Sequence, residues 1–285
     1  MSTATGIHVL GNTLRVVHLE KLDNAYYLRG LINQRVSEAF DFDPQKEVPK
    51  SFVEELGQAL ESLPKPIGTL SFCLSGGLYH IQKIPLEVAG EEDRREQIFW
   101  EASQALISPI DNCVIDFIAV GRAAFWTAVR NGVIDAHETL CSALGETHLH
   151  LSVAPLALFC AGLPARVWEE AGRQMAIHSD SSGAFYISVE NGILVDVETA
   201  SPDSLRLQRW FSISSSPHRP CKRVYLSGDI QAIDPPADLN LVEYPIFRGI
   251  DTVQLSKRDR AELGQASGFA LALGAGLHKL ISETP

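Results

Sequence analysis

Two short segments in distant parts of the chain have residue types that could hold a phosphate group. The first is Gly6-Ile-His-Val-Leu-Gly-Asn-Thr-Leu-Arg15, and the second is Ala176-Ile-His-Ser-Asp-Ser-Ser-Gly183. Each is typical of an apolar strand that runs into a turn of small polar residues. The backbone N–H groups of such turns can point at an anion, and a carboxylate at the strand end could organise Mg²⁺. Here a histidine stands near each strand end, His8 in the first segment and His178 in the second.

The elements around these turns predict two similar lobes of an α/β protein. In the first lobe, strands are expected at 6–10, 14–19 and 25–32, an amphipathic helix at 49–63 and a buried strand at 70–74. In the second lobe, strands are expected at 174–178, 184–190, 193–199, 223–227 and 241–244, with helices at 205–213 and 264–281. The two strand triplets form an internal repeat at the level of pattern.

Between the lobes, the pattern predicts a compact βαββαβ subdomain. Its elements are expected at 78–86, 91–107, 113–120, 124–130, 134–144 and 149–153. We therefore predict three units. The first lobe spans 1–77 with a return segment at 151–172, the inserted subdomain spans 78–150, and the second lobe spans 173–285.

Composition excludes several classes of function. The formal net charge of −11 argues against binding to nucleic acid, which needs a surplus of Lys and Arg, and against direct binding to anionic lipid. The five cysteines are widely spaced and form no CxxC motif, so neither a disulfide framework nor a zinc site is expected. No secretory signal and no apolar stretch long enough for a bilayer is visible, which predicts a cytoplasmic protein without membrane insertion.

A series of motifs resembles the PilM family of cytoplasmic pilus-assembly proteins. The stretch Ile98-Phe-Trp-Glu-Ala-Ser-Gln-Ala-Leu-Ile-Ser-Pro-Ile-Asp111 is similar to the family's Trp-Glu-Ala helix, which a proline and an acidic residue follow. Leu78-Tyr-His-Ile-Gln-Lys-Ile-Pro-Leu86, Asp116 and Phe125-Trp-Thr-Ala-Val-Arg130 fit the neighbouring strands in the same order. Val224-Tyr-Leu-Ser-Gly-Asp-Ile230 is similar to the family's adenosine-contacting turn, and 268–277 to its closing helix.

The resemblance implies an actin-like, ribonuclease H-like fold of two lobes, related to FtsA and to the cytoplasmic domain of GspL. It also implies a platform role, in which the protein binds the cytoplasmic segment of a single-span inner-membrane partner. That partner would be PilN-like or similar to GspL or GspM, and the chain would be peripheral to the bacterial inner membrane. Pilus assembly, type II secretion and competence remain open as the system that it serves.

The chain departs from the family where nucleotide would bind. The family's first turn is Asp-x-Gly-Ser-Ser with a lysine two residues on, whereas this chain has His8, Leu10 and Arg15 there. In the second turn, His178 replaces an aspartate and Asp180 a glycine. The adenosine turn is Gly228-Asp229 where two glycines are expected, and the segment 199–223 is too short for the family's capping subdomain.

These departures predict that the chain does not hydrolyse ATP. Phosphoryl transfer depends on positioning and on neutralisation of charge by Mg²⁺, and imidazole is a poor ligand for that ion. The Leu10 side chain would occupy space near the phosphates, and Asp180 and Asp229 would repel them. We therefore expect neither cofactor nor metal and no catalytic residue. The first hypothesis is a non-enzymatic scaffold.

Other interpretations of the same residues remain open. A nucleotide-dependent ATPase or switch with bound Mg-ATP would keep six contacts, namely Gly11, Asn12, Thr13, Ser181, Ser182 and Gly228. A metal site at His8 and His178 lacks an evident third ligand. Ser75 has no base partner visible in the sequence, so a hydrolase is disfavoured.

The partner segment is expected in a groove between the first lobe and the inserted subdomain. Extended peptides can add main-chain hydrogen bonds in such a groove, while pockets select their side chains. The residues predicted to contribute are Ile81, Ile84, Pro85, Phe99, Trp100 and Ile107. Trp100 could equally pack in the core of the subdomain.

Overall fold

The computed structural model describes residues 1–40, 42, 46–88, 90–200, 204–215, 220–229 and 240–282. The first lobe is built on a six-stranded sheet with the order β14-β3-β2-β1-β4-β8. Its strands are β1 (Ser2–Leu10), β2 (Thr13–Leu22), β3 (Ala25–Arg35), β4 (Thr69–Leu74), β8 (Leu149–Val153) and β14 (Ile250–Asp251). The hairpins β1–β2 and β2–β3 are antiparallel, whereas β4 pairs in parallel with β1 and with β8. Helix α1 (Lys50–Glu61) packs Phe52, Leu56 and Leu60 into the core of this lobe.

The second lobe repeats the antiparallel triplet on a five-stranded sheet. The strand order is β11-β10-β9-β12-β13. Its elements are β9 (Arg173–Asp180), β10 (Gly183–Glu190), β11 (Ile193–Ala200), α5 (Ser204–Ser214), β12 (Cys221–Gly228) and β13 (Leu241–Glu243). Trp210 and Phe211 of α5 pack against Met175 and Ile177 of β9. The repeated pattern in the sequence is therefore a repeat in the structure.

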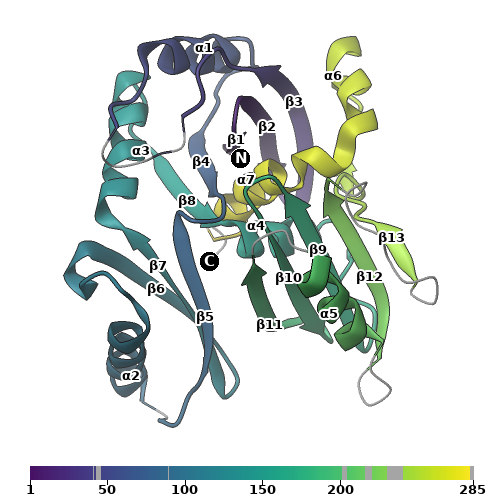
Figure 1. The fold of residues 1–285 in the computed structure, drawn as a ribbon. Helices are drawn as coiled ribbons and strands as arrows, with labels where there is room; N and C mark the ends of the chain where they lie inside the picture. The colour runs from purple at the N-terminus through teal and green to yellow at the C-terminus, as the bar shows by residue number, and fades with distance from the viewer. Residues whose placement is uncertain are drawn as a thin grey trace.

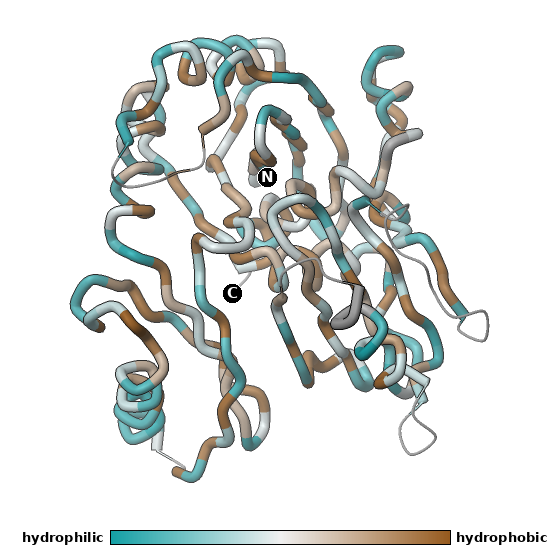
Figure 2. The backbone as a smooth tube through the Cα atoms, in the orientation of Figure 1, coloured by the Kyte–Doolittle hydropathy of each residue, from teal (hydrophilic) through white to brown (hydrophobic). Residues whose placement is uncertain are grey.

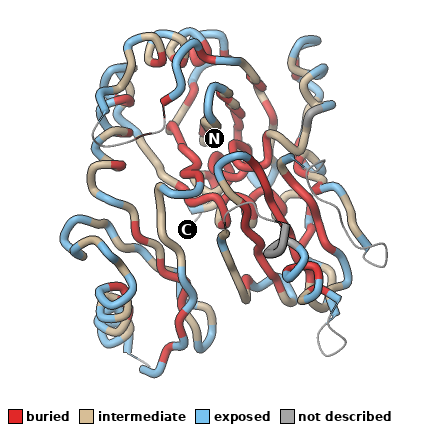
Figure 3. Tube along the Cα trace, in the orientation of Figure 1, coloured by how far each residue is buried: buried red, intermediate tan, exposed pale blue. Residues whose placement is uncertain are grey.

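Helices α4 (Ala154–Ala161) and α7 (Ala270–Ser282) lie between the two sheets (Figure 1). The two helices approach each other at the backbone, because a Cβ on Gly274 would overlap the Ala157 carbonyl. Helix α7 approaches β1 as closely, because a Cβ on Gly6 would overlap the Ala272 carbonyl. Figure 3 shows buried stretches through this central region, where one core cluster contains residues of both sheets and of both helices. The two lobes therefore share one core through these helices.

The C-terminal helix differs from the prediction. Instead of one helix at 264–281, the chain forms α6 (Lys257–Glu262), a 3₁₀ segment at Leu263–Phe269, and then α7. Ser256 caps α6, since its hydroxyl accepts a hydrogen bond from the Asp259 N–H. Gly264 and Gly268 lie in the 3₁₀ segment, and glycine is a poor helix former.

The inserted subdomain has a sheet of its own with the order β5-β7-β6. Its strands are β5 (Tyr79–Pro85), β6 (Cys113–Val120) and β7 (Ala123–Arg130), and helix α2 (Glu91–Ala105) covers one face. Ile84, Ile98 and Trp126 form its small core. Figure 2 shows that α2 is largely hydrophilic, unlike the strands of the two lobes.

The βαββαβ order is present, but its last two elements join the first lobe. Strand β8 pairs with β4, and α3 (Asn131–Ala143) buries Leu140 and Cys141 in the core of that lobe. The actin-like α/β fold class is confirmed, whereas the domain boundaries stay a prediction.

Candidate interlobe cleft

The first strand-turn unit is a tight hairpin. Leu10 of β1 pairs with Thr13 of β2, so only Gly11 and Asn12 form the turn. Both turn residues are exposed, and Asn12 donates a hydrogen bond to the Val36 carbonyl at 3.4 Å. Gly11, Asn12 and Thr13 line none of the three cavities of the described chain that lie along the cleft and beside β12. The structure therefore does not bring this part of the predicted phosphate site to the cleft.

His8 is buried at the end of β1 and binds a serine from the first lobe. Its Nε2 lies 2.8 Å from the Ser75 hydroxyl, and its Nδ1 is buried without a partner. Burial lowers the pKa of His8 to about 3, against a smaller opposing effect of Asp180. His8 is therefore a neutral imidazole at neutral pH. No local sequence pattern indicates the contact with Ser75, because the two residues are far apart in the chain.

Ser75 and His8 form a pair without the third group that a hydrolase needs. In a nucleophilic triad, a carboxylate holds the second ring nitrogen of the histidine. That nitrogen, Nδ1 of His8, has no partner. With a pKa of about 3, His8 is also a weak base. The pair is better explained as a buried hydrogen bond of the first lobe.

The second strand-turn unit holds an ionised carboxylate in a hydrogen-bond network. His178 Nε2 donates to Asp180 Oδ2 at 3.0 Å, and the Ser182 N–H and hydroxyl donate to Asp180 Oδ1 at 2.8 and 2.6 Å. The other ring nitrogen of His178 lies 3.0 Å from the Ser227 hydroxyl. Burial raises the pKa of Asp180, but the hydrogen bonds from His178 and Ser182 outweigh it and hold the pKa well below its usual range.

The two lobes touch at their turns. The turn Ser75-Gly76-Gly77 follows β4, and a Cβ on Gly76 would lie 2.8 Å from the Ser182 carbonyl oxygen of the second lobe. This approach leaves two cavities that both have His178 and Asp180 in their walls. Glycine at position 76 is what allows the turns to meet.

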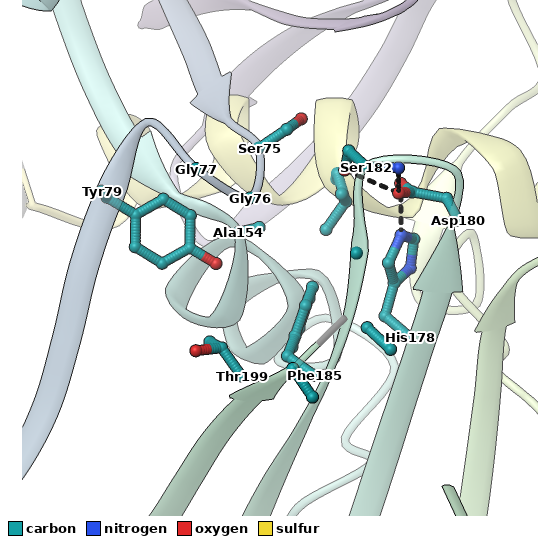
Figure 4. A pocket seen from close by; sticks show the side chains of 14 residues that line it. Ser75, Gly76, Gly77, Tyr79, Ala154, His178, Asp180, Ser182, Phe185 and Thr199 are labelled. Carbon is teal, nitrogen blue, oxygen red and sulfur yellow. Dashed lines mark hydrogen bonds and ion pairs between the residues drawn. The ribbon is translucent and has the colours of Figure 1, made fainter. Parts of the chain in front are cut away.

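The cavity on the subdomain side measures about 330 Å³. Figure 4 shows that the Tyr79 hydroxyl points into it and that Thr199 and Phe185 form the wall below. Ser182, one of the predicted nucleotide contacts, lines this cavity. Neither lysine nor arginine lines it, so it offers no cationic side chain to a phosphate.

The cavity on the opposite side measures about 410 Å³ and contains the other predicted contacts. Ser181 and Gly228 line it together with Leu10, Arg15 and Asp229. Arg15 has neither a hydrogen bond nor an ion pair within the described chain, and burial lowers the pKa of its guanidinium. A third cavity of about 590 Å³ shares Gly228 and Asp229 with it and adds apolar walls from β12 and β13.

The residues predicted to contact a partner do not form one surface. Ile84 is 2% exposed and packs against Trp126, so it belongs to the core of the subdomain. Ile81 packs on the sheet face away from α2. On α2, Phe99 is half-buried with the Arg95 guanidinium over its ring, whereas Trp100 is 62% exposed.

Two further positions from that prediction are accessible. Ile107, after α2, is fully exposed, and Pro85 at the end of β5 is exposed as well. The exposure of Trp100 answers the question that the sequence left open about its packing. Trp100 and Ile107 are therefore available to a partner on the α2 side of the subdomain.

Within the described residues, no group of three or more His, Cys, Asp or Glu side chains is arranged to hold a metal ion. No helix in the same part of the chain is both long enough and apolar enough to cross a membrane.

Comparison with known proteins identifies similar folds. No family model matches the sequence, and no curated protein matches it. Among solved structures, the chain is similar to the PilM-PilN type IV pilus biogenesis complex, with a TM-score of 0.77 and 15% identity over 96% of this chain and 98% of that chain.

Two other solved structures share the fold less closely. The cytoplasmic domain of EpsL, an inner-membrane component of the type II secretion system of Vibrio cholerae, has a TM-score of 0.53 and 8% identity, over 98% of this chain and 95% of that chain. The inorganic polyphosphate/ATP-glucomannokinase of Arthrobacter sp. strain KM has a TM-score of 0.50 and 13% identity, over 99% and 100% of the two chains. At such low identities, the likeness establishes the fold alone, and the same fold carries both assembly proteins and a kinase.

Proposed function

We propose that this chain is a non-enzymatic scaffold of a type IV pilus or type II secretion-like assembly platform at the bacterial inner membrane. It would be cytoplasmic and would bind a short cytoplasmic segment of a single-span membrane partner that is PilN-like or similar to GspL or GspM. The likeness to the PilM-PilN complex over nearly the whole length of both chains supports this role. The likeness to the EpsL cytoplasmic domain supports it independently.

The observation that carries the proposal is that the side chains of His8, His178 and Asp180 at the cleft are already held by hydrogen bonds within the protein. Asp180, the only carboxylate buried at the second turn, accepts hydrogen bonds from His178 and Ser182 and is not free to hold a hydrated cation. At the first strand end, His8 is engaged by Ser75. Charge neutralisation by Mg²⁺ is central to phosphoryl transfer, so a site of this kind favours a structural role.

The direct test is binding of the partner segment. A peptide with the cytoplasmic N-terminal sequence of a co-encoded single-span membrane protein should bind the purified chain in isothermal titration calorimetry. A scrambled peptide of the same composition is the control. Equal binding of the two peptides, or binding of neither, would contradict the proposal.

A second candidate, a nucleotide-binding switch, is favoured by one observation. The Arg15 side chain, which has no partner among the described residues, lies in the wall of the 410 Å³ cavity, beside Ser181 and next to the cavity lined by β12 and β13. A guanidinium in this position could hold an anionic group without a metal ion. The nucleotide-binding alternative therefore has one cationic side chain that could hold a phosphate, whereas Asp180 and Asp229 in the same cavity would repel it.

Thermal melting with ATP, with and without Mg²⁺, separates the two candidates. A ligand that binds only the folded state at a hundredfold excess over Kd stabilises it by about 2.7 kcal/mol. We expect no shift from Mg-ATP. A clear shift with ATP, with or without Mg²⁺, that Arg15→Met abolishes would favour the switch over the scaffold.

A further inference from the structure

The two edge strands of the subdomain sheet, β5 and β6, differ in how they are protected against pairing with another strand. Strand β5 carries Lys83 and Pro85, and the Lys83 ammonium donates a hydrogen bond to the Val195 carbonyl of β11 at 2.7 Å. Lysine, proline and coverage by another element are common means of protecting a sheet edge. Strand β6, at the other edge, carries neither lysine nor proline. It approaches β11, and Val120 at its end packs on the central core, but no described strand other than β7 pairs with it.

The β6 edge is long, regular and apolar. Its eight residues, Cys-Val-Ile-Asp-Phe-Ile-Ala-Val, contain one charged side chain, that of Asp116. The register with β7 runs without a bulge from Cys113 to Val120. On the face away from α2, Val114 is 52% and Ile118 is 41% exposed. A free edge with these properties invites another strand.

Asp116 protects this edge in the free protein. Its Oδ1 accepts a hydrogen bond of 2.8 Å from the N–H of Phe117, the next residue in the same strand. Because N–H groups alternate in direction along a strand, the N–H and C=O of Ile115, Phe117 and Ala119 share the unpaired side. An incoming strand must therefore displace the Asp116 carboxylate, which then needs a new partner.

A second copy of this chain does not provide that partner. In a symmetric antiparallel pair of β6 strands, opposing residues lie on the same face. Asp116 would then face another Asp116 or one of the three apolar residues of its face, Val114, Ile118 and Val120. The first arrangement sets like charges against each other, and the others bury a charge beside an apolar side chain.

We propose that β6 is the docking edge for an extended segment of alternating apolar residues with one Lys or Arg placed opposite Asp116. This inference rests on the proposed function, because it takes the membrane partner's cytoplasmic segment as the source of that strand. Cytoplasmic segments beside a membrane span are enriched in Lys and Arg, and this chain carries a net charge of −11. Apolar contacts with Val114 and Ile118 and a charge pair at Asp116 together fix the register of the added strand.

The test uses two fluorescein-labelled probes in anisotropy titrations against the full chain. One probe is the native N-terminal segment of the co-encoded membrane protein. The other is a designed peptide of about ten residues, long enough for one strand, with alternating Val and a central Lys on the Val face. A twin of the designed peptide has Glu in place of that Lys.

Asp116→Lys reverses the charge on the edge, and Glu96→Lys makes the same change on exposed α2 as a matched control. We expect the Lys probe to bind wild type and the control alike, and Asp116→Lys to weaken it by about tenfold or more. The Glu twin should bind Asp116→Lys with an affinity within about threefold of that between the Lys peptide and wild type, since the two charges are then exchanged.

Each remaining outcome decides the inference. Failure of both probes to bind wild type, or a Glu twin that gains nothing from Asp116→Lys, overturns it. If the native segment binds, but neither Asp116→Lys nor competition by the designed peptide weakens that binding, the inference is also overturned, while the proposed function stands. Charge-dependent binding of the designed peptide without binding of the native segment supports the edge site and contradicts the proposed function.

Discussion

His178 has hydrogen-bond partners at both ring nitrogens, whereas His8 has a partner at only one. Both side chains stand near the ends of equivalent strands in the two lobes. The second-lobe unit contains an ionised carboxylate and donors for it, while the first-lobe unit is neutral and leaves Nδ1 of His8 unpaired. Histidine is therefore part of a fully hydrogen-bonded network with a charged carboxylate in the second lobe, and of a neutral pair with one unpaired nitrogen in the first.

The difference shows where stability is concentrated at the cleft. A buried carboxylate is tolerated when several donors surround it, and each donor then depends on it. A neutral imidazole with one open nitrogen contributes less, because a buried polar atom without a partner carries a desolvation cost. The following substitutions test this contrast, beginning with the residue on which the most donors depend.

Asp180→Ala should cause the largest loss of stability. It leaves the buried His178 Nε2 without its acceptor, and it also removes the acceptor of two hydrogen bonds from Ser182, which is exposed. Breaking a buried charged network by removing one member costs about 3 kcal/mol or more. Urea unfolding followed by circular dichroism measures it. The exposed Asp229, which forms no side-chain hydrogen bond with the described residues of the network, provides the control, and Asp229→Ala should cost about 0.5 kcal/mol or less.

The two histidines can be compared directly by the same substitution. His178→Leu leaves the Asp180 carboxylate and the Ser227 hydroxyl short of a partner, and we expect a loss of about 2 kcal/mol. His8→Leu also removes the unpaired Nδ1, so its loss should be about 1 kcal/mol or less at pH 7.5. Chemical denaturation of both variants is the measurement. Equal losses would show that the contrast between the units has no energetic meaning.

The sequence predicted the strands and the fold that position this site better than it predicted the side-chain contacts within it. Periodicity and turn residues located nearly all strands, and the order of motifs indicated the actin-like fold. The contacts of His8 with Ser75 and of His178 with Ser227 join residues far apart in the chain, so no local pattern encodes them. The burial of Ile84 and the 3₁₀ break before α7 likewise depend on tertiary packing. The histidines in place of the expected aspartates and Asp180 in place of a glycine were visible, but the hydrogen bonds that His178 and Ser182 donate to Asp180 were not.

His8 should also make stability depend on pH. Burial lowers its pKa from 6.5 to about 3, so the unfolded chain takes up a proton first as the pH falls below 6.5. The folded state therefore loses about 1.4 kcal/mol per pH unit from this one group between pH 6.5 and the lowered pKa. Denaturation at pH 7.5, 6 and 5 should show a steep loss in wild type. His18, His137 and His150 have lowered pKa values too, so part of the loss remains in any single variant.

His8→Leu isolates the contribution of His8. Its stability should fall less steeply than that of wild type by about the same 1.4 kcal/mol per pH unit, so the two curves converge and then cross as the solution is acidified. Parallel curves would mean that His8 titrates in the folded state like an exposed histidine. The buried and neutral character of the first-lobe unit would then be wrong.

Arg15→Met should have the smallest effect and is the most specific test of the cleft. The Arg15 guanidinium is half-buried with neither a hydrogen bond nor an ion pair, so its removal takes away little more than a desolvation cost. Asp180 offsets part of that cost by its negative charge, which gives an expected change within about 0.5 kcal/mol in either direction. Equilibrium unfolding without added ligand measures it, and Arg35→Met is a control at an exposed arginine. A loss well beyond this range would mean that Arg15 belongs to the charged network of the second lobe, and the two units would then be one system across the cleft.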